Sequence, residues 1–166
     1  MLTTLIFLPL AGAILLLLLK GSEGRRDALL RWLSLGVSLL VFALTLVVWA
    51  RFDPSSADYQ FVERREWIPA FGISYLVGVD GISLFLLVLT GFLTPIALLS
   101  SWASVHRRFA EFAAFLLALE SAMLGVFVSL DLFLFYLFWD AMLIPMYFLI
   151  GMWGYERRIY AAVKFI

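Results

Sequence analysis

Two carboxylic acids lie inside long apolar runs of the sequence. Glu120 lies in the run over residues 112–130, and Asp140 lies in the run over 132–153. Placing an aspartate at the centre of a membrane helix costs about 2.5–3.5 kcal/mol on insertion scales. Burial favours the neutral form of such an acid, whereas a nearby cation favours the ionised form. An acid held between these two influences can take up and release a proton, which is the chemistry of a proton relay.

The two acids are expected at the same depth. Each lies about ten residues from the turn near residue 130, so at 1.5 Å per residue both are roughly 15 Å from one membrane face. Acids at one depth on neighbouring antiparallel helices can be coupled, although spacing does not say whether they face each other. Pro145 frees the carbonyl of Ala141 from its helical hydrogen bond. Tyr147 lies on the same helix face as Asp140. We expect the acid, the freed carbonyl and this tyrosine to form a short polar stripe.

Each acid also has a structural interpretation. A lone acid in a membrane helix can be held by a hydrogen bond from a neighbouring helix, and this alternative stays open for both Glu120 and Asp140. Lys164, near the end of the sequence, is either a side chain that reaches the membrane surface or the start of a buried relay.

The composition predicts that these acids belong to a membrane protein. Of the 166 residues, 64% are hydrophobic and 14% are charged, whereas soluble proteins average about 25% charged residues. The chain has no cysteine, which excludes disulfides and thiolate-held clusters, and its one histidine, His106, argues against a histidine-rich metal or haem site. Twelve basic residues balance twelve acidic ones. We therefore expect no metal, no cofactor within this chain and no nucleic-acid partner.

Five apolar runs are long enough to cross a bilayer core of about 30 Å as helices. They cover residues 2–19, 32–50, 82–102, 112–130 and 132–153. A sixth helix begins near Ile159 and stops at Ile166, which predicts a fragment of a longer chain. The predicted fold is all-α and integral to the membrane, with five transmembrane helices plus the start of a sixth. Asp80 and Asp131 precede the third and fifth helices, where an aspartate can cap free backbone amides.

The distribution of basic residues predicts the orientation. If the loops alternate across the membrane, one side carries only Arg51, Arg64 and Arg65, in a loop near residues 51–80. The other side carries the remaining nine: Lys20, Arg25, Arg26, Arg31, Arg107, Arg108, Arg157, Arg158 and Lys164. The positive-inside rule puts the richer side in the cytoplasm and the N-terminus outside.

Three segments resemble a known family. The segment from Asp131 to Gly154, DLFLFYLFWDAMLIPMYFLIGMWG, is similar to the fifth-helix motif of the subunit M (chain 4) family of NADH:quinone oxidoreductase, respiratory complex I. The segment from Trp67 to Leu84, WIPAFGISYLVGVDGISL, resembles the entry to that family's third helix. The ending RIYAAVKFI resembles the start of the sixth. Multisubunit cation/proton antiporters and membrane hydrogenases have related chains.

The resemblance implies a fold of about fourteen helices with two inverted repeats, each carrying half a proton path. Residues 1–111 would be the N-terminal helices 1–3, and 112–166 the truncated start of the first repeat. The implied function is proton translocation, as a subunit of the oxidoreductase, in the bacterial cytoplasmic (inner) membrane. NADH, FMN, iron–sulfur clusters and quinone would bind in other subunits. The implied partners are other membrane-arm subunits, especially the neighbouring antiporter-like chains, and the lipid bilayer.

The resemblance also assigns residue roles. The family's fifth helix carries a glutamate that pairs with a lysine on a later helix, and that position here is Asp140, whose lysine would lie beyond Ile166. Aspartate is one methylene shorter, so its carboxylate sits about 1.5 Å nearer its own backbone. Glu120 would be a secondary acid and Lys164 a third candidate. The alternatives are a subunit of a multisubunit cation/proton antiporter and a structural membrane scaffold.

Overall fold

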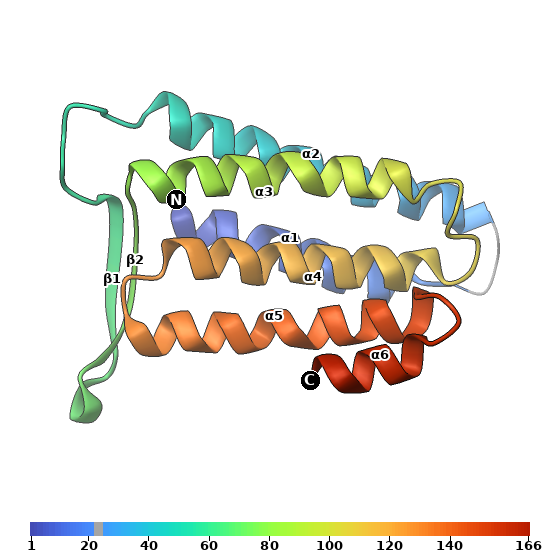
Figure 1. The fold of residues 1–166 in the computed structure, drawn as a ribbon. Helices are drawn as coiled ribbons and strands as arrows, with labels where there is room; N and C mark the ends of the chain where they lie inside the picture. Colours follow the sequence, from blue (N-terminus) through green and yellow to red (C-terminus); the bar gives the residue numbers. More distant parts are fainter. Residues whose placement is uncertain (22–24) are drawn as a thin grey trace.

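The chain forms a bundle of helices with a two-stranded sheet across one end (Figure 1) in a computed structural model that describes residues 1–21 and 25–166. The helices are α1 (Leu2–Leu19), α2 (Arg25–Ala50), α3 (Gly81–Ser100), α4 (Phe109–Val128), α5 (Leu132–Trp153) and α6 (Arg158–Phe165). The strands are β1 (Gln60–Ile68) and β2 (Ile73–Val79), joined by the short 3₁₀ helix Pro69–Phe71. Within this part of the chain, α1 to α5 are each long and apolar enough to cross a membrane.

The predicted spans are confirmed, with shifts at some ends. The bounds of α1 and α5 match the predictions, whereas α2 begins at Arg25, seven residues before the predicted start. Its first turns are charged, so a search for apolar residues does not detect them. Helix α3 ends two residues early and α4 begins three residues early. Helix α4 begins after Arg108, whose left-handed backbone (φ 57°) ends the preceding connection.

The loop over residues 51–80 holds a hairpin that the all-α prediction did not include. Strands β1 and β2 are antiparallel, and Arg65 pairs with Tyr75. Gly72, with φ +67°, makes the turn into β2, a backbone region that other residues rarely adopt. The amide of Leu130 donates to the carbonyl of Leu76 at 2.9 Å. The hairpin is thereby tied to the connection between α4 and α5.

Helix α4 lies at the centre of the bundle, in contact with α1, α2, α3 and α5. It approaches α5 closely at Gly125, where an added Cβ would lie 2.4 Å from the ring of Phe138. Helix α3 approaches α2 in the same way at Gly91, where an added Cβ would meet Thr45 at 3.1 Å. These small residues set the spacing of the helices around the acids.

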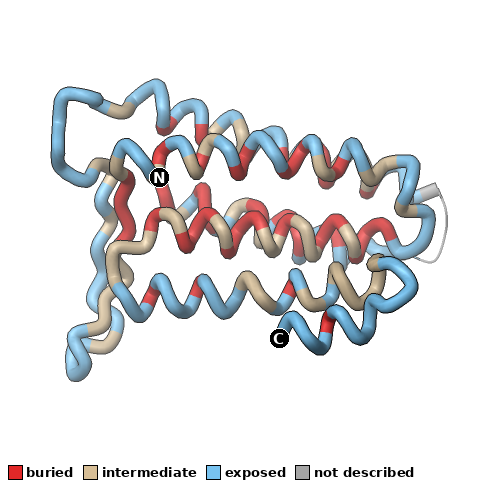
Figure 2. Tube along the Cα trace, viewed as in Figure 1, coloured by how far each residue is buried: buried red, intermediate tan, exposed pale blue. Residues whose placement is uncertain are grey.

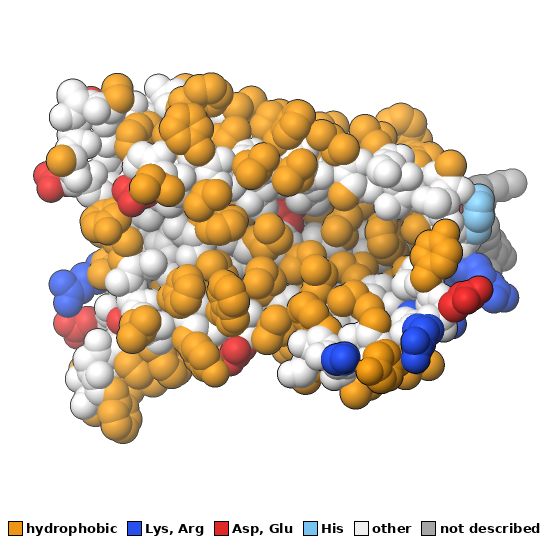
Figure 3. Space-filling model, viewed as in Figure 1, with side chains coloured by type: hydrophobic (Ala, Val, Ile, Leu, Met, Phe, Trp, Pro, Cys, Tyr) orange, Lys and Arg blue, Asp and Glu red, His pale blue; other side chains and the backbone are white. Residues whose placement is uncertain are grey.

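Burial is concentrated on α1 and α4 and is low on α5. Only Leu134, Phe138 and Pro145 of α5 are buried, and the rest of this helix is exposed or half-buried (Figure 2). The visible face of the bundle is largely hydrophobic, with charged side chains gathered mainly towards its two ends (Figure 3). An apolar surface of this extent between charged ends suits lipid rather than water. The chain is an integral membrane protein.

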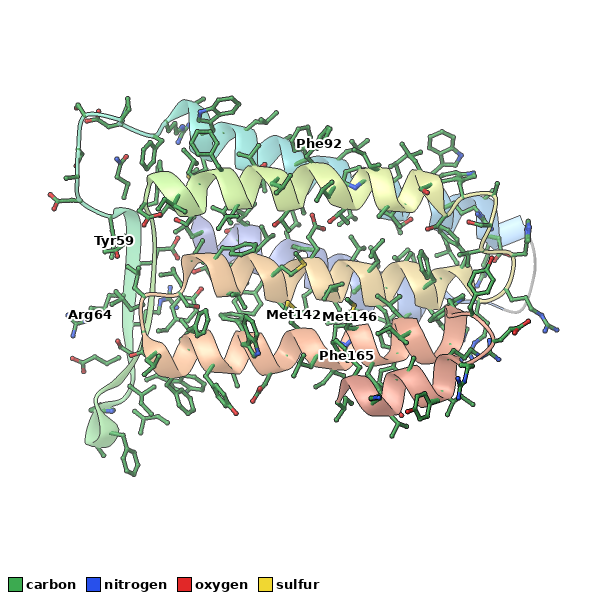
Figure 4. The ribbon with its side chains drawn as sticks, viewed as in Figure 1. Tyr59, Arg64, Phe92, Met142, Met146 and Phe165 are labelled. Carbon is green, nitrogen blue, oxygen red and sulfur yellow. The ribbon has the colours of Figure 1, made fainter. Side chains whose placement is uncertain are left out.

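Different polar contacts fix the two ends. At the hairpin end, the Glu63 carboxylate accepts from the amide of Leu2 at 2.7 Å and from the amino group of Met1 at 2.6 Å. Arg64, the next residue of β1, points away from the helices (Figure 4). At the opposite end, the Arg31 guanidinium of α2 donates to the carbonyl of Val105 at 2.9 Å. This bond fastens the connection between α3 and α4 to α2.

Candidate functional site

Glu120 is the most deeply buried acid that the structure describes. Its exposed fraction is 1%, and both carboxyl oxygens lack a hydrogen-bond partner within residues 1–21 and 25–166. A small cavity of about 150 Å³ lies beside it, lined by Thr90 and Thr94 of α3 among other residues. A water molecule occupies about 30 Å³ of liquid, so this cavity has room for water beside the carboxyl group.

The two threonines give this cavity its polarity. The Thr90 hydroxyl donates to the carbonyl of Leu86 at 2.8 Å, and the Thr94 hydroxyl donates to the carbonyl of Thr90 at 3.1 Å. Each hydroxyl oxygen therefore keeps lone pairs that can accept a hydrogen bond from a further donor. Pro95 follows directly and frees the carbonyl of Gly91 from its helical hydrogen bond. These groups were not predicted from the sequence, although two threonines and a proline in an apolar run mark a polar site within a membrane helix.

Asp140 lies at a similar depth but on a different surface. It is exposed on α5, whereas Phe138, two residues earlier, is buried against α4. At about 100° per residue, Asp140 is therefore on the side of α5 that faces away from α4. Glu120 faces α3 instead. The structure does not bring the two acids together.

Pro145 lines a cavity on the buried side of α5. The cavity has a volume of about 260 Å³ and lies among α1, α4 and α5, with Ala141 and Ser121 also in its wall. The Ser121 hydroxyl donates to the carbonyl of Ile6 at 2.6 Å, which leaves a mostly apolar lining. Of the residues in the predicted polar stripe, Asp140 and Ala141 are exposed and Tyr147 is half-buried.

Lys164 is not placed beside Asp140. Helices α5 and α6 meet at the junction between Trp153 and Arg157. Along its own helix, Lys164 lies about 10 Å from this junction, whereas Asp140 lies about 20 Å from it. Its amino group lies 3.5 Å from the hydroxyl of Tyr160 and above the ring of that residue.

Comparison with known proteins shows which proteins this chain resembles. Residues 129–166, which hold Asp140, match the family described as NADH:quinone oxidoreductase/Mrp antiporter, transmembrane region. The chain is 46% identical to NADH-quinone oxidoreductase subunit M of Rhodobacter capsulatus, over 99% of the chain and 32% of the relative. It is 43% identical to NADH-ubiquinone oxidoreductase chain 4 of Arabidopsis thaliana, over 99% of the chain and 33% of the relative. The chain is therefore similar to these subunits along almost its whole length.

Solved structures agree on the fold. Respiratory complex I from Thermus thermophilus with bound NADH contains a chain that matches with a TM-score of 0.79 and 24% identity, over 98% of this chain and 31% of that one. An archaeal membrane-bound sulfane sulfur reductase contains another, with a TM-score of 0.73 and 19% identity, over 99% and 33%. The chain spans about a third of the length of the curated relatives it matches.

Asp80 and Asp131 cap the starts of two helices. Asp80 accepts from the amides of Ser83 at 2.7 Å and Ile82 at 3.1 Å, at the start of α3. At the start of α5, Asp131 accepts from the amides of Phe133 at 2.9 Å and Leu134 at 3.1 Å. Its other carboxylate oxygen accepts from the amide of Ser74 in β2 at 3.3 Å. The hydrogen bond from Ser83 to Asp80, and that from Leu134 to Asp131, hold the pKa of each carboxyl below its ordinary value. Both side chains are therefore ionised caps at neutral pH.

Glu111 was not singled out from the sequence. It lies in the first turn of α4, is buried, and forms ion pairs with Lys20 and Arg108. The contact joins the last residues of α1 to the start of α4, so it is a structural counterpart to Glu63 at the other end. Its position could have been noticed in the sequence, because it is an acid in the first turn of an apolar helix that directly follows a pair of arginines. Within residues 1–21 and 25–166, no three His, Cys, Asp or Glu side chains are grouped so as to hold a metal ion.

Proposed function

We propose that the chain is part of a proton-translocating membrane subunit of NADH:quinone oxidoreductase. The observation that carries this proposal is the buried acid Glu120, near the middle of a membrane helix in a chain similar to subunit M. Its carboxyl oxygens have no hydrogen-bond partner among the described residues. Keeping such a group costs stability, which is reason to expect a function for it. The chain's own residues would move protons, while NADH, FMN, iron–sulfur clusters and quinone bind in other subunits.

Asp140 is the proposed titrating acid and Glu120 the second. Asp140 faces outward from the 166 residues, so a basic partner must approach from outside them, as the lysine implied by the resemblance would. Approach of that cation favours the ionised carboxylate and releases a proton, and its withdrawal favours uptake. Glu120, with the threonine hydroxyls of α3 nearby, would exchange protons through water in its cavity.

The topology supports a proposed orientation and organisation. The basic residues Lys20, Arg31 and Arg107 lie at the end opposite to the hairpin, so that end would face the cytoplasm of a bacterial inner membrane and the N-terminus would lie outside. Residues 1–111 would form the N-terminal transmembrane helices 1–3 with an outer loop near residues 51–80, and 112–166 would begin the first proton-translocating repeat. The partners would be the other membrane-arm subunits, with the antiporter-like chains as neighbours.

Asp140→Asn in the intact complex tests the proposal. Asparagine keeps the shape of the side chain and cannot release a proton at accessible pH, so NADH-driven proton pumping into inverted membrane vesicles should fall by at least tenfold while the complex assembles. Asp58→Asn, at an exposed position of the hairpin-end loop, is the matched control and should pump normally. Normal pumping by Asp140→Asn would refute the relay. Loss of assembly in its place would favour the structural scaffold.

The matched family also names the Mrp antiporter, which gives a second candidate function. A cation/proton antiporter would move protons in response to a sodium or potassium gradient without NADH. Vesicles holding the full-length protein would then show a pH change on addition of either cation. We expect none unless NADH is oxidised, and a cation-driven pH change that Asp140→Asn abolishes would favour the antiporter.

A further inference from the structure

A cavity of about 500 Å³ lies at the end of the bundle opposite to the hairpin. Its walls come from the connection between α3 and α4 and from the junction of α5 with α6. Three arginines and a histidine line it, together with two large apolar side chains: Arg107, Arg108, Arg158, His106, Met152 and Trp153. None of the groups assigned to proton transfer above lies in this cavity.

The charges around the cavity are predominantly positive. Among the described residues, the buried carboxylate of Glu111 is already paired with two cations, Lys20 and Arg108. Glu156 is exposed on the connection between α5 and α6. Helices α4 and α6 begin at Phe109 and at Arg158, beside the cavity. The positive ends of both helix dipoles therefore add to the arginine charges, an arrangement that favours an anion.

The walls of the cavity are held in place by hydrogen bonds. The indole Nε1 of Trp153 donates to the carbonyl of Arg107 at 3.2 Å, and the Arg158 Nη1 donates to the carbonyl of Met152 at 3.0 Å. The second bond also satisfies a carbonyl at the C-terminal end of α5, whose dipole would otherwise repel an anion. The site is thus built before any ligand arrives.

The position of the cavity decides between a soluble and a membrane-bound anion. Trp153 and Met152 are the last residues of a membrane helix, and tryptophan prefers the level of the lipid headgroups. One wall of the cavity therefore borders the acyl region, and the arginines face the headgroup layer. Basic pockets between membrane helices at this level suit lipid phosphates. We propose that this cavity binds the phosphate headgroup of an anionic phospholipid.

The test uses the full-length protein in its complex, reconstituted into phosphatidylcholine vesicles with a trace of photo-crosslinking phosphatidylglycerol. Arg107→Gln removes one guanidinium and keeps the backbone carbonyl that Trp153 uses, so labelling of residues 104–108 and 152–158 should fall about fivefold. Arg158→Gln should give a similar loss. Arg157→Gln is the matched control, because its guanidinium lies 5.2 Å from the Tyr160 ring rather than in the cavity wall. It should label as the unaltered protein does.

Two further arms separate the ligand sources. Millimolar inorganic phosphate should leave the labelling unchanged, and a photo-crosslinking phosphatidylcholine should label the same peptides several-fold less. The proposal is overturned if Arg157→Gln lowers labelling as much as Arg107→Gln, which would indicate general surface charge. It is also overturned if neither cavity variant lowers labelling, if phosphate displaces the probe, or if both lipids label equally. Thermal unfolding of each variant complex verifies that it is folded, and proton pumping serves as an independent readout of the proposed function.

Discussion

Replacing Glu120 by methionine should stabilise the protein while impairing proton transfer. Methionine has a similar length and no polar atoms, so it fills the same space between α3 and α4. The substitution removes two buried oxygens that have no hydrogen-bond partner within the described residues. If the acid serves proton transfer, its removal raises stability and lowers activity. The two measurements together therefore test whether Glu120 has a function.

The magnitude follows from the cost of an unsatisfied buried polar group, about 1–3 kcal/mol. Glu120 has an exposed fraction of 1%, so water outside the bundle does not relieve this cost. A neutral carboxyl can donate only one hydrogen bond, to a threonine oxygen or to a water in the cavity. We therefore expect Glu120→Met to raise the free energy of unfolding by about 1–3 kcal/mol.

Denaturant titration of the full-length protein in lipid micelles measures this change, with Leu119→Met as the matched control. Leu119 lines the same cavity, and its exchange for methionine conserves volume, so the effect should stay below about 1.5 kcal/mol. NADH-driven pumping should fall with Glu120→Met and be normal with Leu119→Met. A loss of stability with Glu120→Met would show that the acid has a partner outside these residues, and would refute the reasoning. Unimpaired pumping would remove Glu120 from the proton path.

Two structural predictions concern the pairing of α4 with α5. Asp131→Ala removes the acceptor for the amides of Phe133 and Leu134 and should lower the free energy of unfolding by about 1 kcal/mol at neutral pH. Because the pKa of Asp131 is lowered, this stabilisation is complete above the ordinary aspartate pKa of about 3.9 and is lost as the pH falls through the lowered value. Denaturation of both proteins across acidic pH should therefore show the difference closing. Gly125→Ala would place a methyl group 2.4 Å from the Phe138 ring and should cost about 1–3 kcal/mol; Phe138→Leu in the same chain should recover part of this loss in a double-mutant cycle.

The membrane spans were predictable because twenty apolar residues in a row have few other uses in a folded protein. Helix starts were less predictable, since α2 extends through a charged turn from Arg25 that carries no apolar signal. The hairpin was not predicted because β1 carries four charged residues in a row and because the hairpin is stabilised by contacts with the connection near Leu130. Such contacts join segments that are distant in the sequence.

The candidate acids were found from the sequence, but their surroundings were not. An ionisable residue in an apolar run is conspicuous at any position, so Glu120 and Asp140 needed no structure to be noticed. Which way each acid faces depends on how the helices rotate against one another, and that rotation follows from side chains such as Phe138 fitting against Gly125. The threonines of α3 beside Glu120 become relevant only once the packing of α3 on α4 is known.

The placement of the acids on different surfaces constrains any proton path through this part of the chain. Glu120 faces α3 and Asp140 faces away from α4, so they do not form a pair that shares a proton. The cavity of about 260 Å³ between α4 and α5 is lined by the residues that follow each acid, Ser121 and Ala141. Its lining is mostly apolar, and the Ser121 hydroxyl is already bonded to α1, so it offers water few partners. A direct transfer from one acid to the other would need that cavity to fill with water, whereas the polar groups of α3 give Glu120 a route on its own side.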